Sequence, residues 1–159
     1  MRSTISRSAR TRAWLVAAAV VASSLFSACM LFAKPPADLD YSRTRTSESG
    51  RYKATIKPEG DSIPKGKLQR WTLHIETANG SAVDACEVTV DGGMPQHGHG
   101  LPTKPRVTRH LGNGDHLVEG MKFNMGGWWV VKFRVASSAG ADSVVFNLSL
   151  SARRCARPA

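Results

Sequence analysis

Apolar and polar residues alternate with a period of two along most of the chain from Gly50 onward. Alternation of this kind places apolar side chains on one face of a strand, whereas a helix would need a 3.6-residue period, which is absent here. The pattern therefore predicts strands that each bury one face. The apolar rows are Tyr52, Ala54, Ile56; Trp71, Leu73, Ile75; Ala82, Cys86, Val88, Val90; Trp129, Val131, Phe133, Val135; and Val144, Phe146, Leu148, Leu150.

Turn-forming residues separate the rows, with Asn79-Gly80, Asp91-Gly92-Gly93 and Gly112-Asn113-Gly114 as the strongest signals. Two further short strands are predicted at 106–110 and 116–123. Short strands at this spacing favour an all-β, immunoglobulin-like antiparallel β-sandwich of about seven strands over residues 50–151. A domain of this size buries about 60–70% of its unfolded surface, enough to fold alone.

The first part of the chain has the pattern of an export segment. Four arginines lie within the first twelve residues, and Trp14–Ala33 then carries no charge. A basic region followed by an apolar region is typical of a signal peptide, predicted here over residues 1–28. Leu25-Phe26-Ser27-Ala28-Cys29 resembles a bacterial lipobox, which makes Cys29 the candidate lipidated N-terminus and predicts a lipid anchor in the membrane.

Two alternatives stay open for this segment: ordinary cleavage after Ala28 or Ala33, and an uncleaved anchor, since 20 apolar residues just span a bilayer. All three place the remainder outside the cytoplasm, in the periplasm or at the cell surface. Residues 29–49 hold Pro35-Pro36 and few apolar residues, which predicts a flexible, disordered linker. Residues 152–159 form a basic C-terminal tail.

Charge limits the classes of partner. The chain has 22 Lys and Arg against 12 Asp and Glu, a formal charge of +10. In the body, basic residues alternate with apolar ones rather than forming a stripe with aromatic residues between them, so nucleic acid is not predicted as a partner. A preference for anionic surfaces such as lipid headgroups is what the charge supports.

The remaining cysteines are compatible with an oxidising compartment. If Cys29 is lipidated, Cys86 and Cys155 form a candidate disulfide that would close a long loop and stabilise the fold by about 4 kcal/mol. The alternative is two unpaired thiols, with Cys86 buried and Cys155 in the tail.

Two stretches carry the candidate chemistry: Met94-Pro95-Gln96-His97-Gly98-His99-Gly100-Leu101-Pro102, and Met121 to Trp129. Thioether and imidazole groups suit copper, with methionine favouring the cuprous state. The candidate copper ligands are Met94, His97, His99, Met121 and Met125, and the neighbouring tryptophans could shield the site. In the alternative interpretation, the glycines and prolines shape a turn, and the methionines pack against Trp128 in the core.

The other histidines carry no predicted role: His74 is expected to be solvated on the polar face, and His110 lies at a strand end. Acidic residues are scattered among turns. The sequence has no Ser/His/Asp spacing, phosphate-binding glycine loop or zinc-type ligand cluster, so an enzyme is not predicted.

With Gly50-Arg51-Tyr52, Gly114-Asp115-His116 and Met125-Gly126-Gly127-Trp128, the histidine turn resembles the YtkA-like domain family, which is related to the FixH proteins. The resemblance covers about 50–150 and implies a small exported sandwich domain, often membrane-tethered. FixH is associated with cation-pump and cytochrome-oxidase maturation. Asp115-His116 departs from the family, whose members tend to have an aromatic residue there, so the role of His116 stays open.

Together these observations predict a non-enzymatic, exported, membrane-tethered β-sandwich that handles copper through its His/Met-rich loop, with a possible protein partner in a copper-handling complex. The alternative is an interaction or structural accessory domain of a membrane complex with no metal site.

Overall fold

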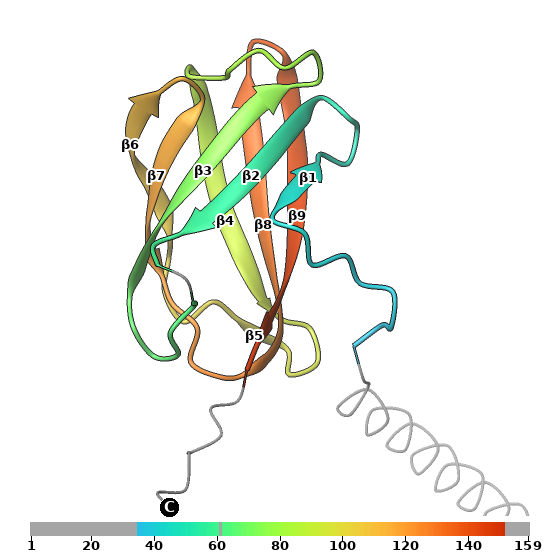
Figure 1. The fold of residues 1–159 in the computed structure, drawn as a ribbon, viewed down its shortest axis with the longest axis vertical. Coiled ribbons are helices and arrows are strands. Elements are labelled where there is room, and N and C mark those ends of the chain that lie inside the picture. Colours follow the sequence, from blue (N-terminus) through green and yellow to red (C-terminus); the bar gives the residue numbers. More distant parts are fainter. Residues whose placement is uncertain (1–34, 61, 152–159) are drawn as a thin grey trace, which may run out of the picture. The chain divides into compact units, whose positions relative to one another are not determined.

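The computed structural model describes residues 35–60 and 62–151, and the folded unit lies within Pro36–Ala159. Its described residues form one antiparallel sheet of nine strands (Figure 1). The strands are β1 (Thr44–Thr46), β2 (Tyr52–Pro58), β3 (Gln69–Thr77), β4 (Cys86–Met94), β5 (His99–Gly100), β6 (Arg106–Gly112), β7 (Asp115–Met121), β8 (Gly127–Ser137) and β9 (Gly140–Leu150). The predicted all-β antiparallel class is confirmed.

The sheet runs in the order β1-β2-β3-β7-β6-β4-β8-β9, with β5 paired to β4. Its middle is narrow, because β6 and β4 are joined at a single residue pair, Arg106 and Thr89. On either side of that pair the strands pair over many residues, and the sheet curls into a nearly closed, barrel-like arrangement (Figure 1).

The strand count differs from about seven because of the two shortest strands. β1 lies within residues 29–49, where the sequence predicts a flexible linker, yet Arg45 pairs with Ala54 of β2. Its residues are polar because β1 is an edge strand with little to bury, so the apolar pattern could not reveal it. β5 has only two residues and shows no alternation.

Buried side chains follow the predicted alternation closely. The core comprises the inward-facing residues of β2, β3, β7, β8 and β9, together with Val83, Met94 and Phe123. One position is wrong: Ala82 is exposed and Val83 is buried instead. The Val83 amide donates to the Ile75 carbonyl, which fixes Val83 toward the interior.

Asp142 connects the two ends of the sheet. Its carboxylate, near the start of β9, accepts hydrogen bonds from the backbone amides of Ser49 at 3.0 Å and Arg51 at 3.4 Å, in the turn between β1 and β2. The Glu48 amide also donates to the Ser143 carbonyl. Burial by itself would raise the pKa of Asp142, but hydrogen bonds from Ser47 and the backbone amides outweigh it and lower the pKa to about 2.

This lowered pKa predicts an acid-sensitive fold. The folded-state pKa lies below the ordinary value of 3.8, so the stabilisation is present above that value and is lost as the pH falls toward 2. We expect the free energy of unfolding, measured by denaturant titration, to fall across this window. Asp142→Asn should lower the free energy of unfolding at pH 7 and flatten its dependence on pH. Asp38→Asn, at an exposed carboxylate, is the matched control and should keep the wild-type profile.

Candidate functional site

The two candidate stretches meet at one end of the sheet. The connections from β4 to β6 and from β7 to β8 lie at the same end (Figure 1). β5 folds back on β4, so that Met94 pairs with His99 and Gly93 with Gly100. The Met94 methyl carbon lies 3.1 Å from where a Cβ on Gly127, the first residue of β8, would stand. Residues far apart in sequence are therefore neighbours here, as a shared site requires.

The predicted ligands separate into two groups. Met94 and Met121 are buried in the core, with 1% and 0% of their surface exposed. Met125 is 42% exposed, and His97 and His99 are also exposed. The buried thioethers pack among apolar side chains, so only three of the five predicted ligands reach the surface.

His97 and His99 stand side by side at the tip of the loop. Their rings are nearly parallel, with an interplanar angle of 5° and centroids 6.1 Å apart. Backbone hydrogen bonds fix the loop, because the His97 amide donates to the Met94 carbonyl and the Leu101 amide donates to the Gly92 carbonyl. Backbone bonds therefore hold the loop while leaving the imidazoles exposed.

The two tryptophans have different positions. Trp129 is buried, and its indole N–H donates to the Met125 carbonyl at 3.0 Å, which anchors the second loop. Trp128 is half-buried and donates to Asn147 at 3.0 Å on β9. Neighbouring strand residues point to opposite faces, so the pair cannot shield one site together.

Comparison with known proteins places these features in a family. The family model described as YtkA-like matches residues 46–134, which is more than half of the chain. This chain belongs to the YtkA-like family. The matched region contains both loops of the candidate site and confirms the resemblance based on the histidine turn.

Two other comparisons add little about function. The solved structure named "ZirS C-terminal Domain" is similar to this YtkA-like chain over 73% of this chain and 82% of that one, with 9% sequence identity and a TM-score of 0.36. A search of curated proteins found none that matches.

A histidine pair that sequence reasoning passed over lies elsewhere in the YtkA-like domain. His116 of β7 is fully buried, and its Nε2 lies 2.8 Å from the Val83 carbonyl, to which it donates. Its Nδ1 then accepts from His110 Nδ1 at 2.7 Å. Burial lowers the pKa of His116, and the neighbouring His110 acts in the same direction. His116 alternates with the buried Val118, which is the sequence signal that could have placed it inside.

Cys86 lies beside this pair. Its half-buried thiol is 3.7 Å from His116 Nε2, and burial, followed by the charge of Asp84, raises the pKa of the thiol. A raised pKa disfavours the thiolate and makes the sulfur less reactive. Cys29 and Cys155 lie outside the described residues, as do the signal segment 1–28 and the tail, so lipidation and the Cys86–Cys155 disulfide stay predictions.

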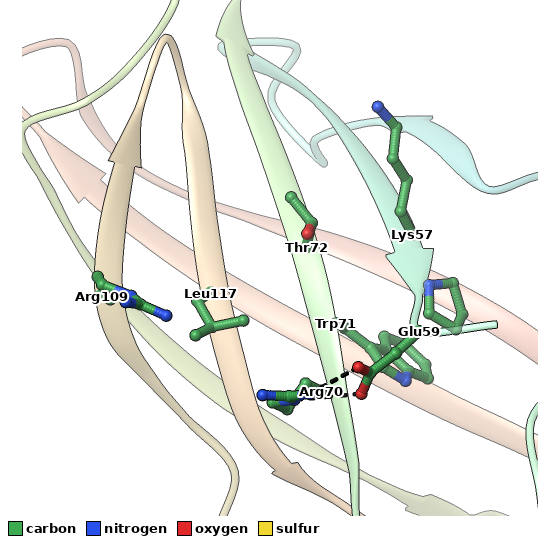
Figure 2. Close-up of a pocket in the computed structure, with 8 residues that line it drawn as sticks. Lys57, Glu59, Arg70, Trp71, Thr72, Arg109 and Leu117 are labelled. Carbon is green, nitrogen blue, oxygen red and sulfur yellow. Dashed lines mark hydrogen bonds and ion pairs between the residues drawn. The ribbon is translucent and has the colours of Figure 1, made fainter.

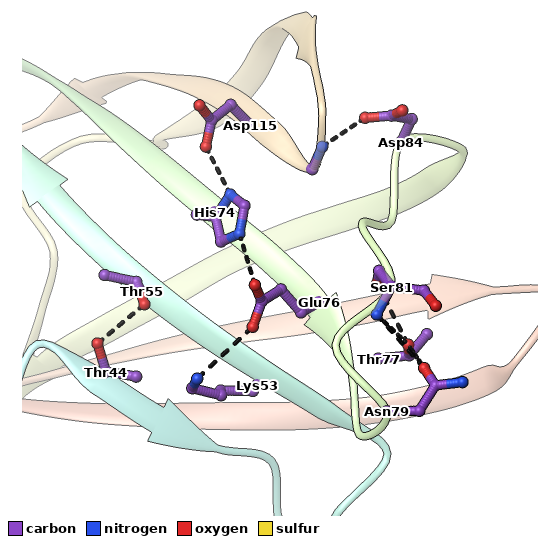
Figure 3. A network of polar contacts seen from close by, with 11 residues as sticks. Thr44, Lys53, Thr55, His74, Glu76, Thr77, Asn79, Ser81, Asp84 and Asp115 are labelled. Carbon is purple, nitrogen blue, oxygen red and sulfur yellow. Dashed lines mark hydrogen bonds and ion pairs between the residues drawn. The ribbon is translucent and has the colours of Figure 1, made fainter.

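His74 lies on the polar face of its strand, as expected, but its side chain is paired with carboxylates rather than only solvated. It is half-buried on the outer face of β3, with Nδ1 2.7 Å from Asp115 and Nε2 3.3 Å from Glu76 (Figure 3). Glu76 in turn lies 3.6 Å from Lys53 of β2. The hydrogen bond from His74 lowers the pKa of Glu76, with Lys53 acting in the same direction. The polar face of β3 is thus tied to both neighbouring strands.

Across residues 35–60 and 62–151, no group of three or more His, Cys, Asp or Glu side chains is arranged to hold a metal ion. The predicted copper set is of a different kind, because it combines histidine nitrogen with methionine sulfur. In the same part of the chain, no helix has the length and apolar character needed to cross a membrane.

Proposed function

We propose that this YtkA-like protein is a non-enzymatic, exported and membrane-tethered module that binds copper at the loop bearing His97 and His99. The observation that carries the proposal is this pair of exposed, parallel imidazoles on a loop held by backbone hydrogen bonds. Exposed side chains change rotamer within picoseconds to nanoseconds, so both rings are free to turn toward one ion. Imidazole serves cupric and cuprous copper alike.

Met125 is the third proposed ligand. Its side chain is exposed, and the hydrogen bond from Trp129 to its carbonyl fixes its backbone beside Gly127. A thioether needs no deprotonation and favours the cuprous ion. Met94 and Met121 then pack in the core and do not bind the ion, since reaching a surface ion would require them to leave the interior.

The proposal includes the compartment and the finer fold. The basic and apolar leader supports export, and Cys29 supports a lipid anchor. The single pair joining β4 to β6 supports an immunoglobulin-like sandwich, with β1, β2, β3, β7 and β6 in one sheet and β4, β8 and β9 in the other.

A second candidate is an interaction domain without a metal site, serving as an accessory to a membrane complex. The burial of Met94 and Met121 favours it, because two of the predicted ligands then have a purely structural role. Under this alternative the histidine loop forms part of a protein-binding surface.

Competition titrations with cuprous and cupric chelators distinguish the two functions. The full-length chain in maltoside micelles should bind one copper ion tightly. In His97→Ala/His99→Ala we expect the affinity to fall by more than about 100-fold, since even outer-shell changes weaken metal binding by about 10–100-fold. Met125→Leu should weaken binding of the cuprous ion more than that of the cupric ion.

Met94→Leu is the matched control, because it removes a buried thioether while nearly keeping side-chain volume. It should retain wild-type affinity. Equal loss in Met94→Leu and Met125→Leu would contradict the three-ligand site. Weak binding that is the same in wild type and the double histidine variant would reject the copper function in favour of the interaction domain.

A further inference from the structure

The outer face of strands β2, β3, β7 and β6 carries its charges in rows that run across the strands. In one row, Arg70 binds Glu59 through two hydrogen bonds of 3.1 and 2.7 Å, and Arg106 pairs in register with Glu119. In a more distant row, Lys53 lies 3.6 Å from Glu76. These rows contain acids that balance their cations.

One row between them contains no acid. Register places Lys57 opposite Thr72, Thr72 opposite Leu117, and Leu117 opposite Arg109. Within the described residues, neither Lys57 nor Arg109 has an ion pair, and the half-buried Thr72 hydroxyl has no hydrogen-bond partner. Two cations and one hydroxyl donor therefore lie in line without a protein acceptor.

The same row lines a hollow of about 280 Å³ in the outer face (Figure 2). Arg109 extends from β6 toward Leu117 of β7, whereas the Lys57 ammonium extends away along β2 (Figure 2). Glu59 also borders the hollow, but its carboxylate faces Arg70, and the hydrogen bond from Arg70 lowers its pKa. The carboxylate at the rim is thus already paired.

We propose that this hollow is a binding site for a phosphate group, with Arg109, Thr72 and Lys57 as its donors. Arginine offers a fork of N–H groups that matches phosphate oxygens, and lysine adds a mobile point charge. The two terminal cations stand at opposite ends of the row, three interstrand steps and about 14 Å apart between backbones, and the exposed Lys57 side chain reaches the hollow by a change of rotamer. Two unpaired positive charges offset the charge of inorganic phosphate or a phosphomonoester, about −1.5 to −2 at neutral pH, and exceed the single negative charge of a phospholipid phosphodiester.

The site is independent of the copper proposal, since it uses other residues on the outer face of the sheet. The phosphate group has two sources that share this chemistry: the headgroup of an anionic phospholipid, or a soluble phosphate. A tethered domain would use the first to hold its outer face against the membrane.

NMR of the ¹⁵N-labelled full-length chain in neutral maltoside micelles tests the site. We expect inorganic phosphate, or phosphatidylglycerol added to the micelles, to shift the Thr72 and Leu117 amide signals and the Arg109 Nε–H signal in a saturable way. Response to phosphate identifies a soluble ligand, and response to the lipid alone identifies a headgroup. Lys57→Gln/Arg109→Gln should lower the affinity for whichever probe binds the wild type by at least about tenfold, because hydrogen bonds to charged groups are lost.

Lys65→Gln/Lys67→Gln is the control. It removes the same charge from exposed residues of the β2–β3 connection, away from the row, and should leave the affinity unchanged. Equal weakening in both double variants would show attraction to overall charge and overturn the site. The absence of a saturable shift with either probe in the wild type would also overturn it.

Discussion

Phe123→Ala is expected to lower the free energy of unfolding by about 3–5 kcal/mol, as is typical when a buried phenylalanine is truncated. Phe123 is fully buried between two indoles, stacked on Trp71 with centroids 5.7 Å apart and edge-on to Trp129 at 5.2 Å. Removing the ring leaves a cavity and breaks two aromatic contacts at once. Small domains have about 5–15 kcal/mol of total stability, so the loss is a large fraction of it.

The change should also loosen the candidate site, because Phe123 lies in the connection between β7 and β8 that carries Met125. Urea unfolding measures the stability, and amide exchange in 122–126 measures the local effect. Leu68→Ala is the control: this residue is 67% exposed, and its truncation should cost less than about 0.5 kcal/mol. A loss at Phe123 no larger than at Leu68 would show that the aromatic cluster is not a rigid part of the core.

Gly93→Ala is expected to displace β5 and remove tight copper binding. A Cβ at Gly93 would stand 2.2 Å from the His99 carbonyl oxygen and 3.0 Å from the Gly100 Cα, both backbone atoms that cannot rotate away. Overpacking of this kind typically costs about 1–3 kcal/mol, and here the relief must come from the strand that carries His99. The histidine pair would then lose its position while the rest of the sheet keeps its core.

Gly100→Ala provides the matched control one strand away. Its Cβ would meet only the Gly92 carbonyl oxygen at 3.7 Å, an ordinary contact, so this variant should bind copper like the wild type. Chelator competition and unfolding of both variants check the prediction. If Gly93→Ala keeps wild-type affinity, the hairpin of β4 and β5 does not position the site.

The buried face of each longer strand was predictable from the sequence, because burial on one side of a strand repeats every second position. The apolar rows of β2, β3, β8 and β9 all face the core, as the sequence indicates. The same rule could have placed His116 inside with Val118, but the polarity of its side chain hid the signal. β1 was not predictable, since an edge strand of Thr-Arg-Thr buries almost nothing.

The candidate site was predictable in part. The sequence places His97 and His99 on a turn, and the structure leaves both exposed there. Proximity of the two loops depends on β4 pairing with β8, which no local pattern encodes. Burial of Met94 and Met121 was equally hidden, because methionine is compatible with both a core and a ligand role.

By itself, the sequence determined the antiparallel all-β class, the inward residues of its longer strands and the YtkA-like family, because these depend on local alternation and short motifs. Only the tertiary structure decided which distant residues share a surface. The order of strands pairs His74 with Asp115 and aligns Lys57, Thr72, Leu117 and Arg109 in one row. Strand register is a long-range property, set by packing of the whole core, so chemistry between strands appears only when the sheet is assembled.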